Sequence, residues 1–419
     1  MDIKDFVRKL SKHARSEQAA STLWALVGLA GPTFLQLIYI IVAARVLGAD
    51  ITGNFFLIVS VALVASSFVG LGAGGLVMRD TARDANKAPI AFGRAQAMSY
   101  VTFPILLPLV VAGGWYVTKG EVAVWIIIAV SASDLLAARM MTTSWSLFIA
   151  LEEQVRASLL ICTMPLARLG AITLATLWPD DQHFAAFSVL YFAASFTVLA
   201  GTLLYVGSRI GKTPLSLSGF DRSNGVSFSM TWLNTALQTE SDKLLLGLFS
   251  TPAAVAVYAV ASRLMDGAAM PPRALRVSIQ SRLFREGASG HHNTYRLTLK
   301  VLPLTIVYGI FAWIGFWLLA PILAWMFGQE FSSLASILPI LGALPLIRAI
   351  SEYGAEIFMA SDRPGVQAVI QSVATILRMG LGFILIAAFE LQGAVATALL
   401  VSILSGAILW YLAWKLSRH

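Results

Sequence analysis

Apolar segments of about 20 or more residues recur from residue 20 to the end of the chain. An α-helix rises about 1.5 Å per residue, so about 20 apolar residues cross the roughly 30 Å hydrocarbon core of a bilayer. Charged residues make up only 12% of the chain, against roughly 25% in soluble domains. Membrane-spanning strands would instead alternate over about ten residues, and these longer runs argue against them. The sequence therefore predicts an all-α integral membrane protein.

The apolar segments divide into about 12 transmembrane helices joined by short connections rich in glycine, proline and charge. The predicted helices lie at residues 20–46, 52–77, 91–118, 121–149, 156–178, 184–207, 227–250, 252–277, 296–327, 331–360, 364–388 and 391–416.

The longest polar connection, GSRIGKTPLSLSGFDRSNG, starts at Gly207 and leaves six predicted helices on each side. A weak repeat supports two equivalent halves, because ARVLGADITGNFFLIVS in the first half resembles DKLLLGLFSTPAAVAVYAVAS in the second. Two bundles with a site between them are a common transporter layout. We therefore predict a six-helix bundle at 20–207, a cytoplasmic linker at 208–226 and a six-helix bundle at 227–419, arranged around a central cavity.

Basic residues concentrate at both termini and in every second connection, whereas the other connections carry mainly acidic residues. By the positive-inside rule, both termini are expected in the cytoplasm. The net charge of +8 is then a signal of topology and not of nucleic-acid binding. In the leader, Ile3, Phe6, Val7 and Leu10 follow a helical period, which predicts an interfacial cytoplasmic helix at residues 1–19 and no cleaved signal peptide.

Motifs for enzyme chemistry, metals and cofactors give no candidates. The single cysteine, Cys162, excludes an intrachain disulfide, and the five histidines are scattered. The segment GSRIGKT is one residue short of a phosphate loop and follows a membrane helix instead of a strand. The glycine-rich GLGAGG closes an apolar helix, where small residues allow close helix packing. We predict no catalytic residues, no metal site and no cofactor.

Charged residues within the membrane helices are the main functional signal. The helix at 227–250 carries Glu240, Asp242 and Lys243 within four positions. Asn234, Gln238 and Asp242 lie on one helix face, while Glu240 and Lys243 are spaced to pair. A charge at the bilayer centre costs about 2.5–3.5 kcal/mol on insertion scales. Such residues are therefore expected to pair or to line a shared hydrated space.

Two sets of candidate site residues follow. Arginine binds phosphate through two parallel hydrogen bonds, so the buried basic residues are predicted to bind an anionic substrate: Arg139, Arg168, Lys243, Arg263, Arg273, Arg348 and Arg378. Buried carboxylates that neutralise and ionise again suit ion coupling, and these are Asp134, Glu240, Asp242, Glu352 and Glu356. Two alternatives stay open: Arg45, Arg139 and Arg273 as anchors near helix ends, and Glu240–Lys243 as a purely structural pair.

Several stretches resemble the polysaccharide-transporter family, which includes O-antigen flippases and belongs to the multidrug/oligosaccharidyl-lipid/polysaccharide exporter superfamily. They are AARVLGADITGNFFLIVSVALVASSFVGLGAGGLVMRDTAR, SDKLLLGLFSTPAAVAVYAVASRLMDGAAMPPRALRVSIQSRLFRE, LAPILAWMFGQEFSSLASILPILGALPLIRAIS and LQGAVATALLVSILSGAILWYLAWKL. The resemblance implies twelve helices in two bundles and alternating access. It also implies transport of oligosaccharides linked to undecaprenyl pyrophosphate across the bacterial inner membrane. Arg263 is similar to a cavity arginine of the related lipid II flippases.

These observations lead to the hypothesis of a flippase, not an enzyme, for lipid-linked O-antigen or exopolysaccharide units. Its expected partners are the lipid-linked oligosaccharide, the bilayer, H⁺ or Na⁺ as coupling ion, and polysaccharide polymerase or chain-length proteins, with no nucleic acid. One alternative is a multidrug antiporter of the same fold, whose cavity would favour carboxylates and aromatic residues. A membrane polysaccharide polymerase is the other, but no predicted outer connection exceeds about ten residues.

Overall fold

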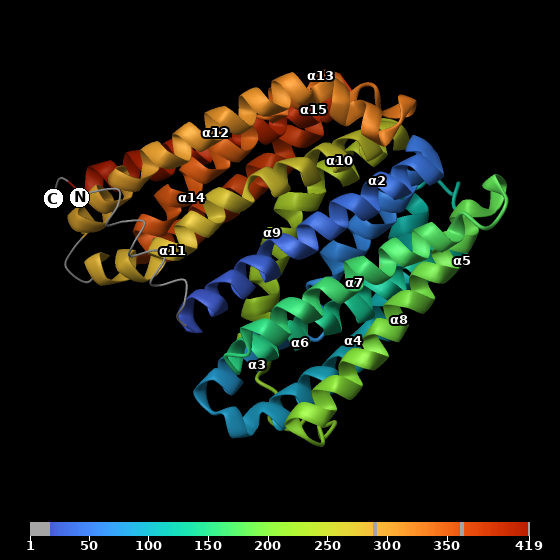
Figure 1. Cartoon of the computed structure of the whole chain (residues 1–419), viewed down its shortest axis with the longest axis horizontal. Coiled ribbons are helices and arrows are strands. Elements are labelled where there is room, and N and C mark those ends of the chain that lie inside the picture. The colour runs from blue at the N-terminus through green and yellow to red at the C-terminus, as the bar shows by residue number, and fades with distance from the viewer. Residues whose placement is uncertain (1–16, 288–290, 361–363, 418–419) are drawn as a thin grey trace. The chain divides into compact units, whose positions relative to one another are not determined.

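The computed structural model describes residues 17–287, 291–360 and 364–417, and these residues form helices without any strand. The interfacial helix predicted at residues 1–19 falls on residues 1–16, which lie outside the described ranges. Figure 1 shows the helices, here in chain order with their bounds: α2 (Glu17–Ser66), α3 (Ala73–Arg83), η1 (Ala85–Lys87), α4 (Ala88–Val117), α5 (Val124–Ala132), η2 (Ser133–Ala138), α6 (Arg139–Ala150), α7 (Gln154–Ala175), η3 (Asp180–Gln182), α8 (His183–Ile210), α9 (Arg222–Phe249), α10 (Pro252–Ala268), α11 (Met270–Gly287), α12 (His291–Phe327), η4 (Gln329–Phe331), α13 (Leu334–Leu341), α14 (Leu344–Ala360) and α15 (Pro364–Ser417).

Nine helices of the described residues are long and apolar enough to cross a membrane. Two of them, α2 and α15, each contain two helices joined at a non-helical residue, Gly48 in α2 and Glu390 in α15. The charged helix α9 is not among the nine. With α9 and the two divisions, the described chain has the twelve helices expected from the sequence. The predicted second helix is interrupted where Gly70, Leu71 and Gly72 adopt positive φ angles, and α3 follows the break.

The described chain forms two compact units. The first unit contains residues up to Tyr39 together with Ala65–Ala112 and Ala123–Leu233. The second unit contains Ile40–Val64, Gly113–Val122 and the residues from Asn234 onward.

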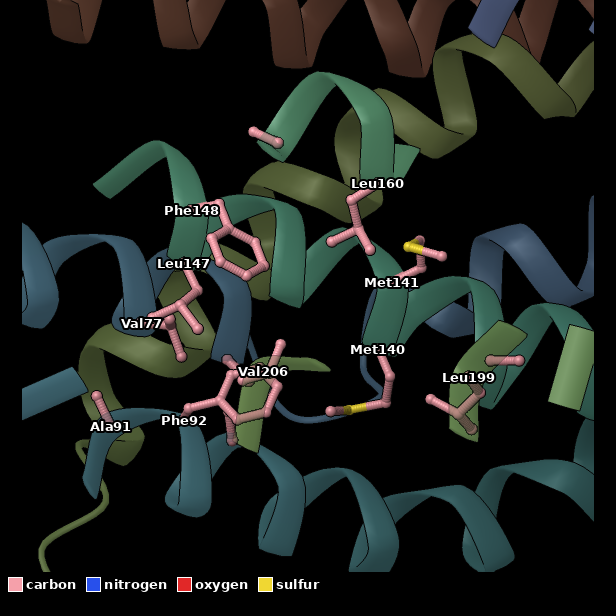
Figure 2. Packing of buried hydrophobic residues seen from close by; sticks show 14 of the residues in the cluster. Val77, Ala91, Phe92, Met140, Met141, Leu147, Phe148, Leu160, Leu199 and Val206 are labelled. Carbon is pink, nitrogen blue, oxygen red and sulfur yellow. The ribbon is translucent and has the colours of Figure 1, made fainter. Parts of the chain in front are cut away.

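The first unit has a core formed by α3, α4, α6, α7 and α8. Figure 2 shows Phe92, Leu147 and Phe148 grouped in this core, with Val77 beside Leu147. Small residues bring its helices together, because a Cβ atom added to Gly72 would lie 2.2 Å from the carbonyl oxygen of Gly225. Close backbone approach of this kind drives helix association in a lipid environment, where apolar burial alone contributes little.

The second unit packs α12, α14 and α15 side by side, with α10, α11 and α13 against them (Figure 1). Residues Ile40–Val64 of α2 belong to this unit, and the part of α2 that contains Gly53 lies very close to α10. A Cβ atom added to Gly53 would be 1.8 Å from the carbonyl oxygen of Pro252. Glu330 also accepts a hydrogen bond from the backbone nitrogen of Ala49 at 2.5 Å, which satisfies a free N–H at the start of this half of α2.

Replacing Gly53 by alanine should therefore destabilise the protein, because the new methyl group meets backbone atoms that cannot rotate away. We expect a loss of about 1–3 kcal/mol or more, the usual cost of overpacking, measured by thermal unfolding in detergent. Gly170→Ala is the matched control, since a Cβ atom there meets no other atom within 4 Å. Equal melting temperatures for Gly53→Ala and the wild type would contradict the close contact.

Candidate functional site

The second unit contains a polar pocket of about 250 Å³ enclosed by α9, α10, α11, α14 and α15. Its charged lining residues are three arginines and two carboxylates: Arg273, Arg348, Arg378, Asp266 and Glu352. Hydroxyl and amide groups complete the polar part of the lining, and they come from Thr235, Gln238, Thr239, Ser351, Gln371, Ser402 and Ser405. Hydrogen-bond donors and acceptors therefore surround a space within helices that are otherwise largely apolar.

Two polar helix faces meet at one wall of this pocket. Gln238 on α9 donates hydrogen bonds to Gln371 and Thr375 on α15, both at 2.9 Å. One turn further along α9, Asp242 forms an ion pair with Arg378 of α15. The polar stripe predicted on the helix at 227–250 thus packs against a polar stripe of the helix at 364–388, formed by Gln371, Thr375 and Arg378. Each stripe supplies the partners that the other needs within the membrane.

Asp242 is the most buried carboxylate at this wall, with 1% of its surface exposed. Besides the ion pair with Arg378, it accepts a 2.5 Å hydrogen bond from the hydroxyl of Tyr258 on α10. A buried charge is tolerated when it is paired and hydrogen-bonded, and Asp242 meets both conditions. Arg378 therefore connects this enclosed pair to the pocket that it lines.

Looser ion pairs surround the rest of the pocket. Arg348 lies 3.7 Å from Asp266, and Arg273 lies 4.0 Å from Glu352. Arg276 on α11 contacts Glu352 at 3.2 Å. These side chains are about 30% exposed in each case, so they have room to exchange partners.

Glu356 and Arg276 extend this network away from the pocket. Glu356 lies 3.2 Å from Arg276 and accepts a 2.7 Å hydrogen bond from Gln280. Arg276 did not emerge from the sequence analysis. Its signal was present, because Arg273, Arg276 and Gln280 follow a helical period on one face of α11.

Glu240 and Lys243 form the ion pair that their spacing predicts, and both side chains are buried. Glu240 also accepts a 2.7 Å hydrogen bond from Ser60, which lies in α2. Arg263 contacts Asp266 at 3.8 Å on the same helix. None of these three predicted site residues, Glu240, Lys243 or Arg263, lines the pocket described above.

The first unit contains a separate buried pair between Asp134 and Arg168, at 2.6 Å. The hydroxyl of Tyr191 lies 3.1 Å from both carboxylate oxygens of Asp134, and the guanidinium of Arg168 lies 4.3 Å from the centre of the Tyr191 ring. Asp134 belongs to η2, a π-helical turn between α5 and α6. Such turns within α-helices are frequent at functional sites.

Pairing accounts for most of the predicted basic residues. Six of the seven predicted basic residues, including Lys243, lie within 4.0 Å of a carboxylate. Arg139 is the exception among the described residues. Helix packing brings a carboxylate from a distant segment to four of the six, Arg168, Arg273, Arg348 and Arg378.

Outside the membrane helices, Asp221 lies in the segment between α8 and α9. Its carboxylate accepts a 2.7 Å hydrogen bond from Asn224 and lies 2.9 Å from Arg79. These contacts lower the pKa of Asp221 from 3.8 to about 2, with the Asn224 side chain as the largest cause and Arg79 next. No group of three or more histidine, cysteine, aspartate or glutamate side chains in the described part of the chain could hold a metal ion.

The Asp221 contacts should make stability depend on acid pH. Because the folded-state pKa is lowered, their contribution is complete above about pH 4 and is lost as pH falls toward 2. Asp221→Asn removes the titrating group, so its melting temperature should fall less than that of the wild type between these pH values. Parallel pH profiles of the two proteins in detergent would contradict the assignment.

Solved structures with the same fold define the class of protein. An inward-facing multidrug resistance transporter of the MATE family has a TM-score of 0.73 at 13% identity, covering 94% of this chain and 98% of that one. A MOP superfamily transporter from Pyrococcus furiosus, described as having a binding pocket of reverse polarity, has a TM-score of 0.59 at 11% identity, with 95% and 94% covered. The MATE transporter VcmN of Vibrio cholerae, in its bent form, scores 0.58 at 15% identity, with 95% and 98% covered. The chain is thus a multi-pass membrane protein with the fold of MOP-superfamily transporters.

The family follows from the sequence. The model of the polysaccharide biosynthesis protein family matches residues 19–284, which is more than half of the chain, and the protein belongs to that family. None of the curated protein sequences compared with the chain matches it.

Proposed function

We propose that the protein is a flippase for oligosaccharides linked to undecaprenyl pyrophosphate, of the O-antigen or exopolysaccharide type. It would move them from the cytoplasmic to the periplasmic leaflet of a bacterial inner membrane, with both of its own termini in the cytoplasm. The observation that carries the proposal is the arginine-lined polar pocket in a chain of the polysaccharide biosynthesis family.

The lining of this pocket suits a phosphorylated sugar. Three arginines face two carboxylates there, so the lining carries a net positive charge. Guanidinium groups bind phosphate oxygens through parallel hydrogen bonds, and hydroxyl and amide side chains match the hydroxyls of a sugar. Small-molecule sites usually enclose about 300–1,000 Å³. A pocket of about 250 Å³ therefore fits a phosphate group with the adjoining part of one sugar better than a whole oligosaccharide.

The predicted ion-coupling role of the carboxylates is consistent with their contacts. Each of the five, Asp134, Glu240, Asp242, Glu352 and Glu356, lies within reach of a basic side chain. Protonation of such a carboxylate removes the attraction and frees its partner to bind substrate. Proton binding by a carboxylate would then favour phosphate binding at its partner arginine. The assignment of Arg168, Lys243 and Arg263 as substrate ligands remains a prediction, because none of them lines the pocket.

An ion-coupled multidrug antiporter is the second candidate, because solved structures with this fold include multidrug transporters. Drugs of that class are typically cationic and apolar, and the arginines of the pocket would repel them. The pocket therefore favours the flippase, while the fold alone fits both.

Transport in vesicles made from purified components separates these two functions. The purified protein should move a fluorescently labelled undecaprenyl-pyrophosphate-linked oligosaccharide to the opposite leaflet of proteoliposomes, beyond the rate of protein-free vesicles. A parallel assay with a cationic dye and an imposed proton or sodium gradient tests the antiporter. Dye extrusion without movement of the lipid-linked sugar would overturn the proposed function. Addition of purified polymerase or chain-length protein would then test the expected partners.

A further inference from the structure

Arg139, the first residue of α6, is a buried cation without a carboxylate partner among the described residues. Only 8% of its surface is exposed, so the side chain does not extend to an aqueous interface as an anchoring arginine would. Two of its guanidinium nitrogens, Nε and Nη2, are buried and make no hydrogen bond to a described residue. The other deeply buried basic residues, Lys243 and Arg378, each contact a carboxylate.

A buried charge in this state is costly. The energetic penalty for removing an ion from water is several kcal/mol, and a protein normally offsets it with a counter-ion and hydrogen bonds. Arg139 has no counter-ion among the described residues, and two of its nitrogens make no hydrogen bond to them. Arginine remains protonated in proteins, so the group cannot escape the penalty by losing its charge. An anion supplied from outside the chain would provide what is missing.

An exposed aromatic side chain lies beside the buried guanidinium of Arg139. Its guanidinium carbon lies 5.1 Å from the ring centre of Trp232 on α9, and the indole is 43% exposed. Ser229 lies one helical turn before Trp232, and its hydroxyl is likewise buried without a hydrogen-bond partner. The guanidinium thus contacts a side chain that is itself accessible. Stacking against an aromatic ring also orients a guanidinium and leaves its edge free for hydrogen bonds.

The local helix geometry sets Arg139 apart as well. The π-helical turn η2 ends at Ala138, immediately before this residue. One additional residue in a turn rotates the following side chains relative to a regular α-helix. Asp134, within η2, is turned to Arg168. Arg139 follows the turn without a carboxylate of its own.

We propose that Arg139, beneath the indole of Trp232 and with the Ser229 hydroxyl as a further donor, is a binding site for a phosphate group of a lipid. The free edge of the guanidinium donates two hydrogen bonds to phosphate oxygens, and the phosphate neutralises the buried charge. The assignment of this phosphate to the transported lipid rests on the proposed function. A phosphate of a bilayer phospholipid has the same chemistry.

Arg139→Met tests the site, because methionine keeps much of the volume and removes the charge. The full-length protein in neutral detergent should be stabilised by undecaprenyl pyrophosphate without sugar, by phosphatidylglycerol, or by both. For whichever lipid stabilises the wild type, Arg139→Met should weaken apparent binding by about tenfold or more. Arg139→Lys should retain part of the effect, since it keeps the charge but loses the paired donors.

Stability without lipid distinguishes a binding role from a structural one. Because methionine removes an uncompensated buried charge, Arg139→Met should melt no lower than the wild type when lipid is absent. The control is Arg209→Gln, which removes an exposed arginine paired with Glu153 in the same unit and should keep the lipid effect. A lower melting temperature for Arg139→Met together with an unchanged lipid effect would overturn the proposal.

The same proteins separate this site from the proposed function. The wild type could fail to move the lipid-linked oligosaccharide while Arg139→Met still loses lipid binding. That result would contradict the flippase assignment and support the phosphate site. If the wild type transports the lipid-linked oligosaccharide and Arg139→Met binds both lipids normally, only the proposed phosphate site is contradicted. If Arg139→Met loses binding of phosphatidylglycerol alone, the result would support a phospholipid site and contradict a role in holding the transported headgroup.

Discussion

Replacing Arg378 by glutamine should lower the free energy of unfolding by about 3–5 kcal/mol, the range found when one partner of a buried ion pair is removed. Asp242 would then remain 1% exposed as a carboxylate inside the membrane region, with the Tyr258 hydroxyl as a donor. The loss should appear as less folded protein in membranes and as a lower melting temperature in detergent.

The double variant Asp242→Asn with Arg378→Gln is the control for this prediction. Two neutral amides remove the unpaired charge and can still hydrogen-bond each other and Tyr258, so most of the stability should return. If the Arg378→Gln variant is as stable as the wild type, the enclosed Asp242–Arg378 pair is not present in the folded protein. If the double variant is no better than the single one, Arg378 acts through packing and not through charge.

The sequence was sufficient to predict which helix faces are polar. The spacing of Gln238 and Asp242 on one helix, and of Gln371 and Arg378 on another, follows directly from the helical period. The high cost of exposing such groups to lipid then requires that polar faces meet. The contacts between α9 and α15 confirm this reasoning. The pair Glu240–Lys243 was predictable for the same reason, since both residues lie within one turn.

The sequence did not determine which distant residues become partners. Asp134 and Arg168 lie on different helices, and their contact depends on the π-helical turn and on the packing of α7 against α6 and α8. Periodicity carries no information about such a turn or about the rotation of one helix relative to another. The same limit explains Arg276, whose importance appears only when α11 packs against α14 and reaches Glu352 and Glu356.

Arg348→Gln should reduce transport of the lipid-linked oligosaccharide by about tenfold or more, because a charge-assisted hydrogen bond contributes about 1.5–3 kcal/mol. Stability should change little, since Arg348 is 27% exposed and its contact with Asp266 is long, at 3.7 Å. The measurement is the initial rate of transport in proteoliposomes at equal amounts of folded protein.

Arg263→Gln provides a closely matched comparison for Arg348→Gln. Arg263 contacts the same carboxylate, Asp266, at 3.8 Å, but it does not line the pocket. Both variants remove one positive charge and one contact of Asp266, and only Arg348→Gln changes the pocket lining. Transport should therefore fall further in Arg348→Gln. Equal losses would assign the effect to Asp266, and full transport by Arg348→Gln would remove this pocket from the substrate path.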